Sequence, residues 1–492
     1  MIKAVTTDAV ARGARGGGVI AATQFVKLLI QMAGVVVLSR LLSPFDFGLV
    51  GMVAVVLSLG DLFRDFGMST AALQAKTLTP QQASNVFWVS TGLGLASAVA
   101  ITACTPLLVA FYSEPLLSTL APVMAIGLLL GGMQTQLQVN LARRLRFTAL
   151  ALTDLLALVG SLGGAIVVAL LGWGYWALVI QSLGGGVILL GSRLALTRWV
   201  PGLPRRRSGS RSLLQSGTHF GMAQILAFAA SNVDTIVVGA RLGAVPLGFY
   251  NRAFQMYLLP RSGLLDPLTN VVVPTVNGFV REGGSVSGAL LRLQFALSAV
   301  LVWVYLLLAA TAEWLVPAVL GDQWKPAVVL TQILAVGGWF AAFGTISYWT
   351  FVLEGGSREL LRLHLVTKPL AVVFVLIAAP FGLEAVATAF ALGLAIAWPI
   401  NLIWLSRTVG QRSVDFLLAG LRVLSAGTIS LVGAHFVTLL FQGVPPWGVI
   451  AAGSLSATAL FFASLLAFPQ SRRDLRATLA LARAIAAHRR DR

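Results

Sequence analysis

Three polar side chains recur on one face of a long apolar stretch near the start of the chain. The stretch ATQFVKLLIQMAG contains Gln24, Lys27 and Gln31, and their spacing places all three on the same side of an α-helix. An ammonium and two amides on one face can bind an anion and hydrogen-bond to hydroxyl groups. The pattern predicts a polar wall lining a cavity, and the simpler alternative is a lysine that snorkels from the first turns of a membrane helix.

Other polar residues also interrupt apolar stretches. An ionisable side chain at the centre of a membrane helix costs about 2.5–3.5 kcal/mol on insertion scales, so it normally faces a cavity or a partner. Gln224, Ser231 and Asp234 follow helical spacing and predict a second polar wall opposite the first. Asp234 is interpreted either as a coupling residue or as half of an ion pair within its own lobe. The candidate substrate-binding residues are Lys27, Gln24, Gln31, Asn232, Arg252, Arg261 and Lys368.

The composition excludes a water-soluble domain. Hydrophobic residues make up 57% of the 492 residues and charged residues only 11%, with a mean hydropathy of +0.87, which is typical of a polytopic membrane protein. The net charge of +18 comes from short basic clusters between apolar runs, with no basic aromatic patch for nucleic acid. The single cysteine, Cys104, cannot form an internal disulfide. The first 40 residues do not resemble a cleaved signal peptide.

Apolar runs long enough to cross the bilayer predict fourteen membrane helices. The predicted spans are 17–39, 47–72, 84–111, 117–139, 148–171, 174–197, 214–240, 252–276, 289–318, 327–352, 363–381, 383–406, 418–441 and 446–468. With these spans, the loops on one side of the membrane are rich in Lys and Arg and those on the other side are poor in them. Arg193 is assigned to the basic loop that also contains Arg205, Arg206 and Arg207. Because basic loops stay inside, both termini are predicted to be cytoplasmic.

The two halves of the chain share a short motif. Arg40-Leu41 precedes Gly48-Leu49, and Arg241-Leu242 precedes Gly248-Phe249, with each motif joining the first two spans of its half. We infer a duplication of six helices, the construction common among secondary transporters. The predicted division is a lobe at 1–200, a basic linker at 201–212, a second lobe at 213–411, two further helices at 412–468 and a basic tail at 469–492.

The same motifs carry a family resemblance. VLSRLLSPFDFGLVGM, together with SNVDTIVVGARLGAVPLGFYNRAFQMYLLPRSGLLDPLTNVVVPTV, resembles the oligosaccharide flippases of the multidrug/oligosaccharidyl-lipid/polysaccharide exporter superfamily. Within it the chain is most similar to colanic-acid-type and lipopolysaccharide-biosynthesis exporters. The resemblance covers the first twelve spans and is strongest from Asn232 to Thr275.

This resemblance implies an all-α polytopic fold with two six-helix lobes around a central cavity, plus two extra C-terminal helices. It implies alternating-access translocation of a polyprenyl-diphosphate-linked oligosaccharide across the bacterial inner membrane, for exopolysaccharide or lipopolysaccharide biosynthesis. The implied partners are that lipid-linked substrate, membrane lipids, and a polysaccharide polymerase with its export machinery. Neither a cofactor nor a metal is implied.

The residues fit a mechanism of this kind. A lipid diphosphate cannot cross hydrocarbon unaided, but it can enter a wet cleft lined by cations and amides. The chain has no Walker motif, nucleophile elbow or metal-spaced cluster. It is therefore predicted not to be an enzyme, and an inside-negative potential would favour outward movement of the anion by about 2.3 kcal/mol per charge per 100 mV.

Three alternatives stay open at this point. A peptidoglycan-precursor flippase differs only in the head group of its lipid substrate. A multidrug and toxin extrusion antiporter would have the same fold, but its pocket for cationic drugs should be rich in acids and aromatics, whereas the deep groups here include the cations Lys27 and Lys368. A membrane glycosyltransferase or polymerase needs a sizeable outward loop, and the outward loops predicted here are short.

Overall fold

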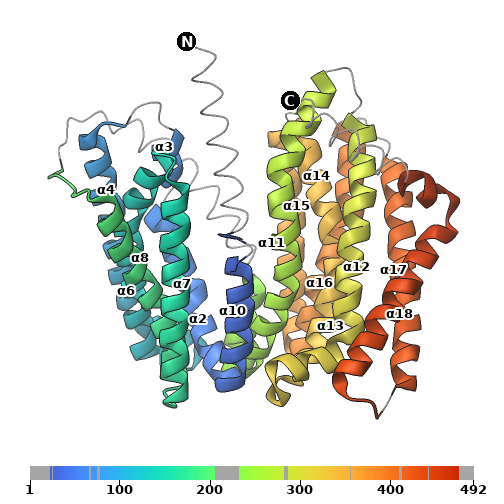
Figure 1. Cartoon of the computed structure of the whole chain (residues 1–492), viewed down its shortest axis with the longest axis horizontal. Helices are drawn as coiled ribbons and strands as arrows, with labels where there is room; N and C mark the ends of the chain where they lie inside the picture. Colours follow the sequence, from blue (N-terminus) through green and yellow to red (C-terminus); the bar gives the residue numbers. More distant parts are fainter. Residues whose placement is uncertain are drawn as a thin grey trace. The chain divides into compact units, whose positions relative to one another are not determined.

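Helices form the whole of the described architecture (Figure 1). The computed structural model describes residues 23–204 and 232–475, except residues 25, 66–67, 75–77, 282–285, 355, 409–412 and 442. Within these residues, eleven helical segments are long and apolar enough to cross a membrane. The chain is therefore a multi-pass all-α membrane protein, and this part of the prediction is confirmed.

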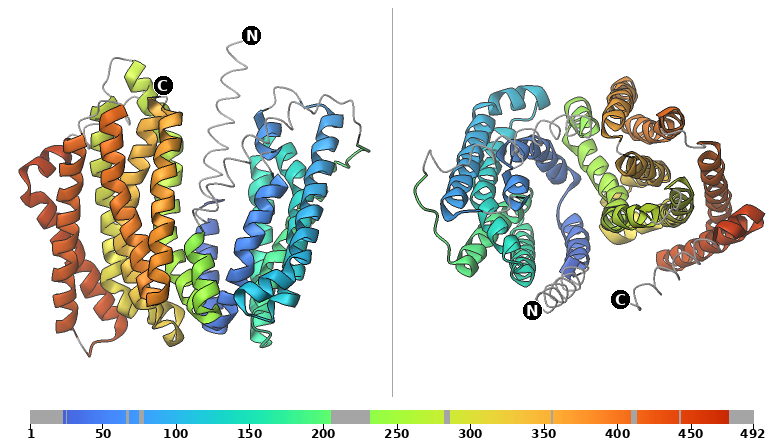
Figure 2. Two further views of the ribbon diagram at one scale, coloured as in Figure 1. Left: turned by 180° about the vertical axis from the view of Figure 1, so that it is seen from behind. Right: turned by 90° about the horizontal axis from the view of Figure 1, so that it is seen from above.

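The chain divides into two compact units, Met1–Gly248 and Phe249–Arg492. The first contains a helix of residues 26–41, then α2 (Pro44–Asp65), α3 (Met68–Gln74), α4 (Pro80–Ala103), α5 (Thr105–Tyr112), α6 (Leu117–Arg143), α7 (Phe147–Leu170), α8 (Trp176–Thr197) and α10 (Val233–Leu242). Seen from above, the long helices of each unit stand side by side as a bundle (Figure 2). In the first unit α4 packs along α6, and α8 packs against both α6 and α7.

The second unit begins within α11. Its helices are α11 (Ala244–Arg281), α12 (Val286–Leu320), α13 (Ala327–Gly338), α14 (Ala341–Leu353), α15 (Ser357–Ala378), α16 (Leu383–Thr408), α17 (Ser413–Leu440) and α18 (Pro446–Ala467), with short 3-10 turns at Asp322–Trp324 and Ala379–Phe381. α10 belongs to the first unit because it packs against α2 and α5. Most of the linker predicted at 201–212 lies outside the described residues, so the division into six-helix lobes stays a prediction.

Most predicted spans agree with the helices to within a few residues, but three of them each cover two helices. The span predicted at 47–72 is α2 followed by α3, that at 84–111 is α4 followed by α5, and that at 327–352 is α13 followed by α14. Pro106 explains the break before α5, since proline cannot donate to the preceding turn. The span at 252–276 lies inside α11, which carries basic and amide side chains and is not among the eleven segments. The start of the span at 17–39 and most of the span at 214–240 lie outside the described residues, so the count of fourteen spans stays a prediction.

The turn into α2 is fixed by a reciprocal pair of hydrogen bonds. The Asp46 carboxylate accepts from the Ser43 backbone amide at 2.8 Å, and the Ser43 hydroxyl accepts from the Asp46 amide at 3.3 Å. Pro44 occupies the first helical position, where its missing amide costs nothing. The serine and aspartate of the SPFDFG motif thus cap a helix.

The glycine of the same motif makes a close backbone contact with its repeat. A Cβ on Gly48 would collide with the Ala244 carbonyl oxygen, and one on Gly248 would collide with the Pro44 carbonyl oxygen. All four residues belong to the first unit. Only glycine allows backbones to approach so closely. Ala244 lies four residues before Gly248, and Pro44 lies four residues before Gly48, so the two contacts are equivalent. Such equivalence is expected when two copies of one motif pack about a local two-fold axis.

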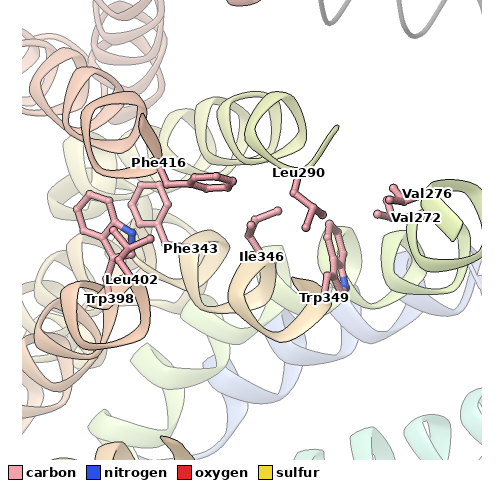
Figure 3. Close-up of a cluster of buried hydrophobic side chains, with 9 residues drawn as sticks. All are labelled: Val272, Val276, Leu290, Phe343, Ile346, Trp349, Trp398, Leu402 and Phe416. Atoms are coloured by element: carbon pink, nitrogen blue, oxygen red, sulfur yellow. The ribbon is translucent and has the colours of Figure 1, made fainter. Parts of the chain in front are cut away.

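One core cluster of the second unit combines aromatic and aliphatic side chains (Figure 3). Trp398 of α16 stacks on Phe343 of α14 with ring centroids 4.3 Å apart. Trp349, also on α14, donates its indole N–H to the hydroxyl of Thr269 on α11 at 3.1 Å. The buried members of this cluster are Val272, Val276, Leu290, Phe343, Ile346, Trp349, Trp398, Leu402 and Phe416. Because lipid is as apolar as these side chains, close packing and the indole hydrogen bond hold the helices together here.

Candidate anion-binding site

Lys27 forms an ion pair with Asp154 on a neighbouring helix. The lysine lies on the helix of residues 26–41, and Asp154 lies near the start of α7. Both side chains are partly buried, with 20% and 31% of their respective surfaces exposed. The ammonium is therefore held against α7 by a carboxylate.

Asp154 is shared with a second cation. Arg193 of α8 donates from Nη2 to Asp154 Oδ1 at 2.9 Å and from Nη1 to Gln138 Oε1 of α6 at 3.3 Å. The arginine side chain is almost fully buried, with 6% of its surface exposed. We call Lys27, Gln138, Asp154 and Arg193 the Asp154 cluster, which joins four helices of the first unit.

The charges of the Asp154 cluster do not cancel. Two cations share one carboxylate, so the cluster carries a net charge of one positive unit when all three groups are ionised. The buried Arg193 Nε has no acceptor among the described residues. An excess cation in a low-dielectric setting attracts anions far more strongly than it would in water. The cluster is thus suited to receive an anionic group on its accessible side.

The Asp154 cluster lies near one end of its helices. Asp154 follows the start of α7 at Phe147, Arg193 precedes the end of α8 at Thr197, and Gln138 precedes the end of α6 at Arg143. At about 1.5 Å per residue, these positions are within about 10 Å of the helix ends. The cluster therefore lies close to the level at which lipid head groups would meet the helices.

The glutamines near Lys27 are both exposed. Gln31 lies one turn after the partly buried lysine on the same helix, and Gln24 is also in a helical conformation. Of the opposing wall predicted from the sequence, Gln224 and Ser231 lie outside the described residues. The predicted pairing of the two walls therefore stays a prediction.

Asn232 and Asp234 lie at the start of α10. The Asn232 backbone carbonyl accepts the first hydrogen bond of the helix, from the Ile236 amide, at 3.0 Å. Asp234 is buried in the first helical turn, where the helix dipole favours a negative charge. Both residues have interaction partners. Asp234 is thus well placed for a structural role, and its predicted coupling role stays a prediction.

Arg252 is buried against an aromatic side chain in the second unit. Its guanidinium lies 5.9 Å from the centre of the Trp324 ring. It also donates to Gln255 Oε1 at 2.6 Å, and Phe249 packs edge-on against the same tryptophan. A cation over an indole face is a stabilising contact. Arg252, the arginine of the GFYNRA motif, therefore helps to pack α11.

Arg261 and Lys368 form a separate basic group in the second unit. Both are exposed on their helices, α11 and α15, and each lies within electrostatic range of the other. His364, one turn before Lys368, adds a third basic side chain. Tyr305 of α12 holds α11 beside Arg261, because its hydroxyl donates to the Tyr257 carbonyl at 2.7 Å. Of the predicted residues, the structure thus brings together Arg261 and Lys368, while Arg252 is buried elsewhere on α11.

Three of the four members of the Asp154 cluster are not among the site residues predicted from the sequence. The assignment of Arg193 to a basic loop is wrong, because Arg193 is buried within α8. Asp154 and Gln138 were not selected, although both lie inside predicted spans. An acid inside an apolar span was a usable signal, since such a residue normally has a partner.

Comparison with known proteins identifies the family. Residues 37–329, more than half of the chain, match the family described as polysaccharide biosynthesis proteins. The chain belongs to this family. The resemblance to polysaccharide exporters inferred from the motifs is therefore confirmed, and its assignment to the colanic-acid-type branch stays a prediction.

Curated relatives come from several bacteria. The lipopolysaccharide biosynthesis protein WzxC of Escherichia coli is 22% identical over 322 residues, which cover 64% of both chains. The succinoglycan biosynthesis transport protein ExoT of Rhizobium meliloti is 26% identical over 319 residues, or 62% of both chains. The teichuronic acid biosynthesis protein TuaB of Bacillus subtilis is 25% identical over 280 residues, or 56% of this chain and 57% of TuaB. The chain thus spans a little under two thirds of the length of these relatives.

Solved transporters have the same fold. The lipid II flippase MurJ in an inward closed conformation aligns with a TM-score of 0.69 at 14% identity, covering 89% of this chain and 97% of MurJ. An inward-facing multidrug resistance MATE transporter aligns with a TM-score of 0.58 at 17% identity, covering 82% and 95%. At these identities the likeness establishes the fold alone.

Proposed function

We propose that this protein is a flippase that moves a polyprenyl-diphosphate-linked oligosaccharide across the bacterial inner membrane by alternating access, for lipopolysaccharide or exopolysaccharide biosynthesis. Family membership supports the polysaccharide pathway. The names of the relatives point to lipopolysaccharide and to succinoglycan transport. The MurJ-like fold supports transport of a lipid-linked substrate.

The Asp154 cluster is the observation that carries this proposal. A diphosphate bears about two negative charges, and a charge-assisted contact with an ammonium or guanidinium is about twice as strong as a neutral hydrogen bond. The cluster offers one excess positive charge near the helix ends, where a head group anchored by its lipid tail would arrive. Lys27 is the member that binds the phosphate, and the exposed Gln24 and Gln31 bind sugar hydroxyls.

The second unit contains a further group of basic side chains. Arg261 and Lys368 lie within electrostatic range of one another, with His364 one turn away. A group of like charges is costly unless an anion offsets it. We assign these residues to a later stage of the diphosphate's path, and Arg252 to the packing that supports α11.

The rival functions differ from the proposed one either in the charge of the binding site or in the sugar of the substrate. A pocket for cationic drugs should present acids, whereas the one carboxylate in the Asp154 cluster already has two cations. A peptidoglycan-precursor flippase would use the same diphosphate chemistry, so the test must identify the sugar. The cytoplasmic termini, and cooperation with a polysaccharide polymerase, belong to the same proposal.

A deletion strain tests the function directly. Without this protein, we expect lipid-linked oligosaccharide to accumulate on the cytoplasmic leaflet, and we expect the wild-type gene to clear it. Lys27→Ala should clear less than a tenth as much at equal expression, because removing a charge from a partly buried site costs more than about 1.4 kcal/mol, a factor of ten. The measurement is mass spectrometry of lipids labelled on one leaflet, which also identifies the sugar.

Lys325→Ala is the matched control. This lysine is 66% exposed and pairs with Asp322 three residues before it, at 3.0 Å, so its loss should leave transport unchanged. Clearance by Lys27→Ala equal to that of Lys325→Ala would refute the role of Lys27. Accumulation of a peptidoglycan precursor in the deletion strain would replace the proposed substrate.

A further inference from the structure

We propose that Asp154 competes with the substrate diphosphate for Lys27 and so sets how readily the anion is released. This inference rests on the proposed function and adds a positioning residue to it. The Asp154 carboxylate holds the Lys27 ammonium when no substrate is bound, gives it up when the phosphate arrives, and takes it back when the phosphate leaves.

The two oxygens of Asp154 have different partners, which makes this exchange possible. Oδ2 faces Lys27 and Oδ1 accepts from Arg193. Lys27 can therefore move to a phosphate while Asp154 stays paired with Arg193. A buried carboxylate left without any partner would be strongly destabilised, and Arg193 prevents that.

Arg193 is the most deeply buried of the three charged members of the Asp154 cluster. Arg193 is 6% exposed, whereas Lys27 is 20% and Asp154 31% exposed. Gln138 also holds Arg193, from α6. Arg193 therefore stays in place during the exchange. An incoming anion reaches the cluster at Lys27, next to the Asp154 oxygen that pairs with it.

Competition between Asp154 and the diphosphate for Lys27 would allow the bound substrate to be released. A lone lysine in a low-dielectric site would bind a diphosphate tightly and release it slowly. Transport requires binding that is strong enough to admit the substrate and weak enough to let it leave. A carboxylate within reach of the same ammonium lowers the affinity by offering a built-in replacement for the phosphate.

The test compares binding with transport in the full-length protein. With polyprenyl diphosphate as the probe and tryptophan fluorescence as the readout, Asp154→Asn should bind about tenfold more tightly, because one competing charge near the ammonium is gone. In lipid vesicles the same variant should flip the probe several-fold more slowly, since release is impaired. Asp154→Glu should restore both values toward wild type.

Asp322→Asn is the matched control, because it removes an exposed carboxylate that also pairs with a lysine. It should change neither binding nor transport.

A second comparison keeps the test independent of folding. Lys27→Met and Lys27→Met/Asp154→Asn should bind the probe equally weakly, because Asp154 acts through Lys27. Replacing both partners by neutral side chains leaves no unpaired charge between Lys27 and Asp154, and Arg193 keeps its hydrogen bond to Gln138.

The outcomes separate this inference from the proposed function. If Lys27→Met abolishes binding but Asp154→Asn binds no more tightly than wild type, the competition is refuted and the function stands. If Asp154→Asn changes binding equally in both backgrounds, Asp154 acts on the phosphate or on the fold directly, and the inference is again refuted. If the wild-type protein does not bind the probe, the proposed function itself fails.

Discussion

At the scale of single residues, one carboxylate determines how two membrane-embedded cations are accommodated. Asp154 pairs with Lys27 through one oxygen and with Arg193 through the other. Each cation would be costly in hydrocarbon alone, and the shared carboxylate removes part of that cost without neutralising the pair. The position of Lys27 near exposed glutamines then leaves it within reach of an anion.

The charge and length of residue 27 should matter in a defined order. Lys27→Arg should retain part of the transport, because a guanidinium keeps the charge but has a different shape. Lys27→Glu should be worse than Lys27→Ala, because it places a second carboxylate against Asp154 and repels the phosphate. Clearance of lipid-linked oligosaccharide at matched expression measures the order. Equal activity of the alanine and glutamate variants would argue against an electrostatic role.

At the scale of helices, the repeated motif works through backbone contacts as much as through side chains. Ser43 and Asp46 cap α2, and Gly48 lets that helix meet the start of α11. Gly248 makes the reciprocal contact with Pro44. The conformations of these two helix starts are therefore coupled, because each glycine depends on the backbone position of the other helix.

Alanine at either glycine should force the two helices apart. We expect Gly48→Ala and Gly248→Ala each to lower the free energy of unfolding by about 1–3 kcal/mol, the usual cost of overpacking, because the clash is with a backbone carbonyl that has no alternative rotamer. Thermal unfolding in detergent would measure the loss.

Gly163 provides the control for this pair. It lies within α7, and a Cβ added to it would meet no atom of the described residues within 4 Å, so Gly163→Ala should be neutral or slightly stabilising. If Gly48→Ala unfolded at the same temperature as Gly163→Ala, the close approach of α2 and α11 would be wrong.

At the scale of the whole molecule, the basic loops predict an orientation in the membrane. The predicted cytoplasmic side contains Arg205, Arg206, Arg207 and the arginine-rich tail. Basic segments next to membrane helices remain inside during insertion. The short turn between α7 and α8, which contains Gly172 and Gly174 in left-handed conformations, joins the opposite ends of those helices.

Reporter fusions should show this orientation. Fusions after Arg207 and after Arg492 should report a cytoplasmic location, and a fusion after Gly172 should report the outside, because α8 separates the turn from the basic segment. Paired phosphatase and fluorescent-protein reporters measure both states. An external signal after Arg207 or Arg492 would invalidate the fourteen-span arrangement.

The sequence by itself determined the membrane class, the family resemblance and the approximate helix bounds. Each of these depends on local properties: the length of an apolar run, the placement of proline, and a motif of adjacent residues. The sequence also selected Lys27, because a lysine inside an apolar stretch stands out without reference to any other part of the chain.

The tertiary structure alone decided which residues meet. Lys27 and Asp154 are 127 positions apart, and Asp154 and Arg193 are 39 apart, so their contact depends on which faces of their helices pack together. The same reason explains why Arg193 was misplaced in a loop and why the contact between Gly48 and Ala244 could not be foreseen. Hydrophobicity specifies that a helix enters the membrane, whereas the rotation of that helix about its axis is set by its neighbours.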